Sequence, residues 1–194
     1  MRRILPTFVL ALLLVPGVLS AQCDVRVLIA YYSQSGHTRI MAESVAAGAR
    51  AVAGTQVTLA SVEAVDTAQL RAAEAVIVGS PVRLANVAVP VMEFLNRWPF
   101  PDGMRDKVGA AFVSGGGISS GEEETQLAIL RAMLIHSMIV VGGGEWSQAF
   151  GASAVTDEAP WVSLPRGQVG GPFLEKAVRL GRRVATITRL LRCR

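Results

Sequence analysis

Short apolar runs alternate with longer amphipathic segments along most of this chain. Each run is rich in Val, Ile or Ala and apolar on successive residues, which is typical of a strand covered on both faces. The runs predict five strands, at Val25–Tyr31, Gln56–Val62, Ala75–Gly79, Val108–Ser114 and Met138–Val141. The segments between and beyond them predict five helices, at Thr38–Val52, Thr67–Arg71, Val87–Asn96, Gly121–His136 and Phe173–Leu191.

The alternation of strands and helices determines the expected fold class. Parallel strands joined by helices require right-handed crossovers, which place helices on both faces of the sheet. We therefore expect one α/β domain, and 194 residues with 51% hydrophobic content are enough to build its core. Ligands of such sheets bind beyond the carboxyl ends of the strands.

The loop between the first strand and the first helix has the composition of a phosphate site. It consists of Ser33, Gln34, Ser35, Gly36, His37 and Thr38. Unpaired N–H groups at a helix N-terminus attract anions, hydroxyl groups add donors, and glycine allows a close turn. The loop lacks the motifs of nucleotide triphosphatases and of dinucleotide folds. A monophosphate, such as that of flavin mononucleotide (FMN), is the better candidate, and an ordinary helix-capping turn is the alternative.

Two more loops at the same edge are rich in Gly, Ser, Pro and Asn. The loop after the third strand includes Pro81, Val82, Arg83, Leu84 and Asn86. The loop after the fourth strand includes Ser114, Gly115, Gly116, Gly117, Ile118 and Ser119. Because the carboxyl ends of parallel strands lie at one edge of a sheet, the three loops are expected to converge there. Together they form the predicted cofactor site, with Arg83 either at the cofactor or on the open surface.

The N-terminus has the pattern of an export signal. Arg2 and Arg3 precede an apolar stretch of roughly 16 residues that ends in small side chains. Residues 1–21 are therefore predicted to be a signal peptide, and residues 22–194 a secreted or periplasmic domain with no membrane span after processing. An uncleaved membrane anchor is the alternative. Both the general and the twin-arginine export routes stay open.

Charge and cysteine content bear on the class of function. Without residues 1–21 the chain has 17 basic and 15 acidic residues, so no nucleic-acid partner is expected. No Ser-His-Asp arrangement and no zinc-ligand pairs are evident, so we expect no metal and assign no catalytic residue. Cys23 and Cys193 either form a disulfide, as an exported protein allows, or are two free thiols.

Arginine and tryptophan positions leave further expectations. Five arginines cluster near the C-terminus, at Arg182, Arg183, Arg189, Arg192 and Arg194. They are expected on the solvated side of the last helix, with a membrane-surface or acidic-partner role as the alternative. Trp146 is expected to pack in the interior. Trp98 is expected either to cover the cofactor or to anchor a core or an interface.

The ordered set of loops resembles the flavodoxin-like NAD(P)H:quinone oxidoreductases of the WrbA type. Tyr31–Thr38 is similar to their phosphate loop, Gly79–Asn86 to their loop along the flavin, and Ser114–Glu123 to their glycine- and serine-rich loop. His136-Ser-Met stands where they carry His-Gly-Met, and Phe150-Gly-Ala resembles their Tyr-Gly-Ala. The resemblance implies a three-layer flavodoxin-like sandwich with a five-stranded parallel sheet in the order 2-1-3-4-5.

The resemblance also implies a chemistry. FMN would be held by the three loops, with His136 approaching the flavin, and would carry electrons from a donor such as NAD(P)H to a quinone or similar small-molecule acceptor. Backbone N–H groups, with Arg83, would stabilise the reduced flavin anion. Segments that help to build the tetramer of those enzymes are shorter here, which leaves a homo-oligomer open. Export would separate the protein from cytoplasmic NAD(P)H, which puts that donor in question.

Two other functions stay open beside an FMN-dependent quinone oxidoreductase. The first is an exported flavodoxin-type carrier, which would use the same cofactor to pass single electrons to a protein partner. The second is a non-catalytic binding domain that has kept the fold and lost the flavin. An accumulating semiquinone would indicate the carrier, and failure to take up FMN would indicate the binding domain.

Overall fold

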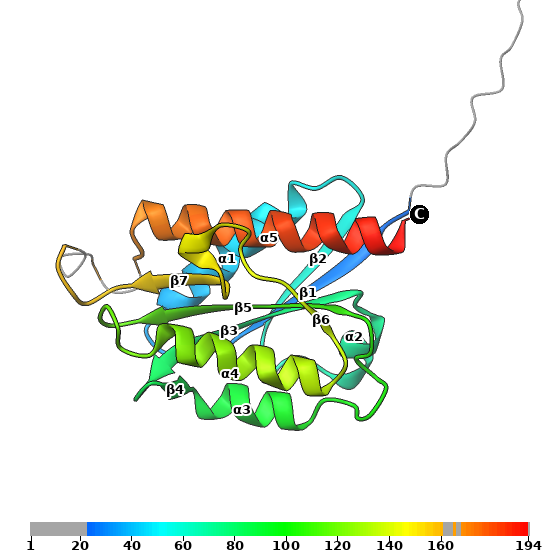
Figure 1. Ribbon diagram of the computed structural model, residues 1–194, viewed down its shortest axis with the longest axis horizontal. Helices are drawn as coiled ribbons and strands as arrows, with labels where there is room; N and C mark the ends of the chain where they lie inside the picture. Colours follow the sequence, from blue (N-terminus) through cyan, green and yellow to red (C-terminus); the bar gives the residue numbers. More distant parts are fainter. Residues whose placement is uncertain (1–22, 161–164, 166–167, 194) are drawn as a thin grey trace, which may run out of the picture.

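The computed structural model describes residues 23–160, 165 and 168–193, which form three layers (Figure 1). A sheet forms the middle layer. Helices α1 (His37–Arg50) and α5 (Gly171–Arg192) cover one of its faces. Helices α2 (Thr67–Ala72), α3 (Val89–Asn96) and α4 (Glu122–Ile135) cover the other face. The three-layer α/β fold expected from the alternating pattern is confirmed.

The sheet is built mainly from parallel strands, and its main path runs in the order β2-β1-β3-β5-β6. The strands on this path are β1 (Val25–Tyr31), β2 (Thr55–Ser61), β3 (Ala75–Arg83), β5 (Val108–Gly115) and β6 (Ile139–Val140). The two-residue β4 (Asn86–Val87) pairs antiparallel with β3 and lies off the path. When β4 is left out, β5 and β6 are the fourth and fifth strands of the path, so the predicted order 2-1-3-4-5 is confirmed.

The outer strand of the sheet is divided into two pieces. β6 pairs with the beginning of β5, where Ile139 lies opposite Val108. A second piece, β7 (Ala152–Val155), pairs with the end of β5. Between them the chain leaves the sheet and forms a 3-10 helix, η1 (Trp146–Gln148). The predicted strand Met138–Val141 is therefore only the first half of this edge, because Ala-Ser-Ala-Val is too short and too weakly apolar to stand out in the sequence.

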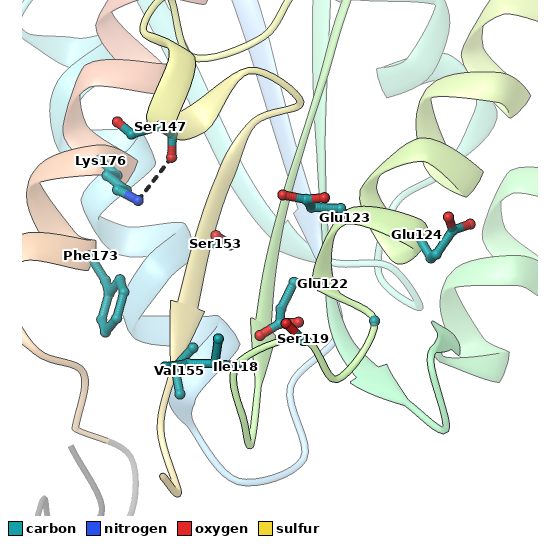
Figure 2. Close-up of a pocket in the computed structure, with 11 residues that line it drawn as sticks. Ile118, Ser119, Glu122, Glu123, Glu124, Ser147, Ser153, Val155, Phe173 and Lys176 are labelled. Atoms are coloured by element: carbon teal, nitrogen blue, oxygen red, sulfur yellow. Dashed lines mark hydrogen bonds between the residues drawn. The ribbon is translucent and has the colours of Figure 1, made fainter. Parts of the chain in front are cut away.

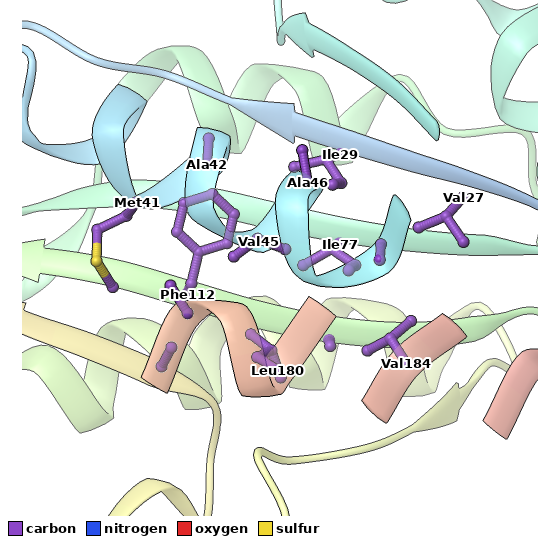
Figure 3. Packing of buried hydrophobic residues seen from close by; sticks show 14 of the residues in the cluster. Val27, Ile29, Met41, Ala42, Val45, Ala46, Ile77, Phe112, Leu180 and Val184 are labelled. Carbon is purple, nitrogen blue, oxygen red and sulfur yellow. The ribbon is translucent and has the colours of Figure 1, made fainter. Parts of the chain in front are cut away.

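Aliphatic side chains surround one aromatic ring on the face under α1 and α5 (Figure 3). Phe112 of β5 is fully buried in this cluster. Met41 and Val45 reach it from α1, and Leu180 and Val184 reach it from α5. The predicted apolar stripe of the last helix thus provides the contact between this helix and the sheet.

Helices α1 and α5 approach each other backbone to backbone through two glycines. A Cβ atom added to Gly181 would lie 1.9 Å from the carbonyl oxygen of Val45. A Cβ atom added to Gly48 would lie 2.0 Å from the carbonyl oxygen of Val178. Only glycine permits such an approach, and the contact fixes α1 in place. The N-terminus of α1, where the predicted phosphate loop lies, is thereby held rigidly against the domain.

A disulfide joins the two ends of the described chain. Cys23, just before β1, is bonded to Cys193, just after α5, and their Cα atoms are 5.7 Å apart. The guanidinium of Arg189 strengthens this corner by donating to the carbonyl oxygens of Cys23 and Gly54, at 2.6 and 3.0 Å. Of the two alternatives for the cysteines, the structure contains the bridge. It lies at the amino ends of the strands, away from the edge that carries the three loops.

The predicted signal peptide, residues 1–21, lies outside the described residues. The boundary at residue 22 therefore stays a prediction. Within the described part of the chain, no helix is both long enough and apolar enough to cross a membrane. The longest of these helices, α5 with 22 residues, carries five arginines.

Candidate functional site

Three loops meet at the carboxyl edge of the sheet. Tyr31 at the end of β1 pairs with Gly79 of β3, and Pro81 further along β3 pairs with Ser114 of β5. The loops that follow these strands therefore start side by side. A hydrogen bond of 2.8 Å between the hydroxyl groups of Thr38 and Ser114 joins the first loop to the third. The structure thus brings the predicted segments 33–38, 81–86 and 114–119 together.

The first loop turns sharply into α1. Gly36 precedes the helix with a φ of 101°, in the left-handed region that glycine adopts without strain. The Ser33 hydroxyl oxygen accepts hydrogen bonds from the N–H groups of Gly36 and Arg39, both at 3.2 Å. The Ser33 side chain therefore holds the shape of the turn, and its own O–H group can still donate to an anion.

The start of α1 presents unpaired donors. Among the described residues, the backbone N–H groups of Ser35, His37 and Thr38 donate no hydrogen bond. The Ser35 hydroxyl and the Nδ1 atom of His37 are 3.0 Å apart, so these side chains pair with each other. The loop borders a hollow of about 450 Å³ that Tyr32 also lines. Free amides at the positive end of a helix of 14 residues form a site for an anion.

The second loop is a tight hairpin between β3 and β4. Leu84 and Ala85 form its turn in the left-handed region, with φ values of 49° and 59°. The Asn86 amide donates to the carbonyl oxygen of Leu84 at 2.8 Å, and the buried Ser80 hydroxyl accepts from the N–H of Ala88 at 3.0 Å. These bonds fix the hairpin while the Leu84 side chain stays 97% exposed. The exposed apolar tip can therefore cover a ligand without refolding.

The third loop rests against the second. A Cβ atom added to Gly121 would lie 2.4 Å from the Cα atom of Ala85, so the two backbones are in contact there. The loop is closed by Ser120, whose hydroxyl donates to the carbonyl oxygen of Gly117 at 2.6 Å. Glu122, the first residue of α4, accepts from the N–H of Ser120 at 3.0 Å. Ile118 lies on the open side of the loop and is 56% exposed.

A segment that the sequence pattern did not mark supports this third loop. The N–H and hydroxyl of Thr156 both donate to the carbonyl oxygen of Gly115, and the N–H of Asp157 donates to that of Gly116. The carboxylate of Glu158 accepts from the N–H of Ile118 at 2.6 Å. These residues continue β7 beyond its end, so recognition of that short strand would have revealed them.

His136 does not join the other predicted site residues. It caps the far end of α4, and the carbonyl oxygen of its neighbour Ser137 accepts from Asp106, near the amino end of β5. Its ring lies 5.5 Å from that of the buried Trp98 and 5.6 Å from that of Phe100. Burial lowers the pKa of His136. Within one chain, both His136 and Trp98 are at the opposite edge of the sheet from the three loops.

A second hollow, of about 480 Å³, opens beside the third loop (Figure 2). Ile118 and Val155 line one end, and Phe173 lines its α5 side. The start of α4 adds three carboxylates, Glu122–Glu124, whereas Lys176 adds one ammonium group, which donates to the Ser147 carbonyl oxygen at 2.9 Å. The excess of negative charge favours a neutral or cationic ligand over a phosphorylated one.

No metal site accompanies these loops in the part of the chain that the structure describes. There, no three His, Cys, Asp or Glu side chains are grouped as metal ligands. The three loops contribute backbone donors, hydroxyl groups and exposed apolar tips. Such a set can bind and orient an anionic cofactor with a flat apolar part.

The fold and the anion-binding loop define a flavodoxin-like α/β protein. The chain belongs to the flavodoxin-domain family, whose sequence model matches residues 28–133. This match includes the first strand from its fourth residue and all three loops. It ends within α4, so the divided outer strand and α5 lie beyond it.

Relatives by sequence carry two different names. An NAD(P)H dehydrogenase (quinone) of Chromohalobacter salexigens is 33% identical over 144 residues, which cover 60% of this chain and 70% of that protein. A similar protein with the same name in Geotalea uraniireducens is 34% identical. A flavodoxin of Aquifex aeolicus is 31% identical over 170 residues, which cover 82% of this chain and 85% of the relative.

Solved structures confirm the fold. A WrbA-like flavodoxin from Agrobacterium tumefaciens superimposes with a TM-score of 0.71 at 24% identity, covering 86% of this chain and 99% of that one. A two-electron reduced flavodoxin from Megasphaera elsdenii superimposes with a TM-score of 0.60 at 20% identity, covering 82% of this chain and 98% of that one. At sequence identities this low, the similarity to these structures shows the fold alone.

The residues present fit the flavin that the family generally binds. The unpaired amides of Ser35, His37 and Thr38 suit a phosphate dianion without a lysine. The exposed tips Leu84 and Ile118, on loops whose backbones touch, suit the two sides of a flat ring. Binding by these individual residues stays a prediction.

Proposed function

We propose that this protein is an exported FMN-dependent oxidoreductase that passes electrons from a reduced donor to a quinone or similar small-molecule acceptor. The observation that carries the proposal is the set of unpaired N–H groups at the start of α1, faced by two loops with exposed apolar tips. Relatives named NAD(P)H dehydrogenase (quinone) support the reaction class. The predicted signal peptide supports export.

The residues of the three loops have different roles in binding FMN. The amides of Ser35, His37 and Thr38, with the dipole of α1, bind the phosphate, while Ser33 keeps the turn in shape. Leu84 and Ile118 exclude water from the faces of the ring. When bound, FMN accepts hydride from the donor and supplies the electrons that reduce the acceptor. Arg83, exposed next to Leu84, supplies positive charge near the site.

The hollow beside the third loop bears on the choice of donor. Its three carboxylates oppose the phosphates of NAD(P)H, although Lys176 offsets part of this charge. A neutral donor or acceptor is better accommodated there. We therefore propose that the acceptor is a neutral quinone. NAD(P)H is one of several electron donors to be compared, because export would separate the protein from the NAD(P)H of the cytoplasm.

A flavodoxin-type carrier of single electrons is the second candidate. The relative named flavodoxin supports it, since it aligns with 82% of this chain, more than the 60% aligned with the quinone dehydrogenase from Chromohalobacter. Stepwise reduction of the FMN-loaded protein distinguishes the two candidates. A semiquinone that accumulates to a large fraction of the protein indicates the carrier, whereas direct two-electron reduction followed by rapid oxidation by a quinone indicates the oxidoreductase.

The first test is uptake of FMN by the purified protein, followed by absorption and by quenching of flavin fluorescence. Wild type is expected to bind FMN, and Gly36→Val is expected to bind it at least about tenfold more weakly. A β-branched residue in the left-handed region costs about 1–2 kcal/mol of conformational free energy, and the turn would relax by moving the N–H groups at the start of α1. Gly36→Asn is the matched control, since Asn tolerates this region, and it is expected to keep most of the affinity. The melting temperature of each variant without FMN separates misfolding from loss of binding.

Two results would overturn the proposal. A wild-type protein that takes up no FMN would indicate the third function, a binding domain without flavin. A Gly36→Val variant that keeps full affinity would show that the phosphate is not held at the start of α1.

A further inference from the structure

The outer face of α5 is strongly basic. The helix carries five arginines and one lysine against a single glutamate. Its inner face is buried against the domain, and Arg182, Arg183 and Arg192 are exposed. Lys176 and Arg179 are half-buried, and Arg189 turns toward the carbonyl oxygens of Cys23 and Gly54 rather than to solvent, contrary to its expected place. Arg179, Arg183, Thr186 and Leu190 follow one another at spacings of four, three and four residues, and therefore form one stripe.

The segment around η1 lies along this stripe. Lys176 donates to the carbonyl oxygen of Ser147 at 2.9 Å, and Arg179 pairs with Glu145 at 3.6 Å. One turn further, a Cβ atom added to Gly144 would lie 3.0 Å from the Cδ atom of Arg183. Residues 143–145 and the stripe also share a hollow of about 460 Å³. The two segments thus form a single surface, named here the α5 face and defined by Trp146, Arg179, Arg182, Arg183 and Leu190.

The α5 face combines unpaired positive charge with exposed apolar side chains. Arg182 and Arg183 are exposed, and neither has an ion-pair partner among the described residues. Trp146 is 93% exposed and Leu190 65% exposed. The expectation that Trp146 packs in the interior is therefore wrong, because η1 lies outside the sheet, against the outer side of α5. Large apolar side chains exposed beside free arginines suit a partner that offers both apolar and anionic groups.

The point where the N-terminal segment joins the domain adds a second argument. Cys23 is bonded to Cys193, which directly follows α5. The first described residue, Cys23, therefore lies at the C-terminal end of this helix. If the predicted apolar segment before it were an uncleaved anchor, the alternative to a signal peptide, it would hold this end of α5 close to a membrane.

We propose that the α5 face docks on an anionic lipid surface. Arginines in the interfacial region pair with lipid phosphates, while tryptophan and leucine side chains enter the boundary between headgroups and acyl chains. An acidic protein would account for the arginines, but exposed Trp146 and Leu190 beside them match the two-part chemistry of a bilayer surface. This docking is independent of flavin binding, since the α5 face contains none of the residues of the three loops.

The test is binding to vesicles of phosphatidylcholine with one third phosphatidylglycerol, compared with phosphatidylcholine alone, by sedimentation and tryptophan fluorescence. Wild type is expected to prefer anionic vesicles at least tenfold, with a preference that falls as salt is raised. The double variant Arg182→Gln/Arg183→Gln is expected to bind them about 25-fold more weakly, about fivefold for each arginine. Binding is expected to shift the tryptophan fluorescence of wild type to shorter wavelength, and Trp146→Ala is expected to remove most of this shift.

A matched control removes the same charge elsewhere. Arg71 and Arg131 are exposed on the helices that cover the other face of the sheet, and Arg71→Gln/Arg131→Gln is expected to bind like wild type. Equal binding to both kinds of vesicle would overturn the proposal, as would equal losses in the two double variants. Failure to bind anionic vesicles at low salt would also overturn it. FMN uptake by the same samples shows that each variant is folded.

Discussion

Burial changes the chemistry of a single side chain at His136. Its ring packs near those of Trp98 and Phe100, and its Nδ1 atom is buried with no hydrogen-bond partner among the described residues. Burial disfavours the charged form and lowers the pKa of His136 in the folded protein. The unfolded chain then binds the proton more readily. Folding stability is therefore full above about pH 6.5 and is lost as pH falls from there toward the lower folded pKa.

Replacing His136 with Asn is expected to reduce this loss. Between about pH 7 and 5, the melting temperature of wild type should fall more than that of the variant, because only wild type has this buried imidazole to protonate. Thermal unfolding followed by circular dichroism measures the difference. The chain has only two histidines, so the same replacement at His37 is the matched control. An equally steep fall in wild type and in His136→Asn would contradict the role of burial.

At the scale of elements, one buried hydrogen bond ties α1 to β5. The hydroxyl groups of Thr38 and Ser114 are 2.8 Å apart, and the two residues are 1% and 6% exposed. Because Thr38 lies in the first turn of α1 and Ser114 near the end of β5, this bond sets the distance between the first and third loops. A buried hydroxyl that loses its partner is costly, so the pair couples folding to the geometry of the site.

Thr38→Val is expected to lower the free energy of unfolding by about 1–3 kcal/mol, because it leaves the Ser114 hydroxyl without a partner. The double variant Thr38→Val/Ser114→Ala is expected to lose less than the sum of the two single variants. Urea denaturation measures all three. Thr58→Val, at an exposed position of β2, is the control and should change stability by less than about 0.5 kcal/mol. Strictly additive losses would show that the two hydroxyl groups do not interact.

At the scale of the whole molecule, the disulfide closes nearly the entire described chain into one loop. Cys23 and Cys193 are 170 residues apart, and a cross-link over such a distance removes much of the entropy of the unfolded chain. The bridge also holds α5 to the beginning of β1, next to the Arg189 hydrogen bonds. It thereby secures the last helix, which carries the α5 face and covers α1.

Replacing both cysteines with serine is expected to cost about 5 kcal/mol in the chain-entropy model. For a domain of this size that corresponds to a fall in melting temperature of roughly 10–20 °C. A reductant should lower the melting temperature of wild type by a similar amount and leave the double variant unchanged. If reductant and substitution both left the melting temperature where it was, the bridge would add nothing to stability.

The local pattern predicted much of the fold and the segments of the candidate site. β1 begins and ends at the predicted residues Val25 and Tyr31, and α1, α4 and α5 lie within two residues of their predicted ends. Strong periodicity and caps make such elements readable. β7 and the hairpin strand β4 were missed because they are short and owe their stability to pairing with β5 and β3. His136 was grouped with the loops by resemblance, whereas the length of α4 carries it to the opposite edge.

The sequence by itself determined the α/β class, the order of the elements and the three loops, because alternation of apolar runs, glycines and caps acts over a few neighbouring residues. Only the tertiary structure decided which donors stay unpaired at α1, that Ser33 supports the turn, and that Trp146 lies outside beside free arginines. It also decided between a bridge and free thiols. These outcomes depend on distances between residues far apart in the chain, which packing of the whole molecule sets and no local pattern records.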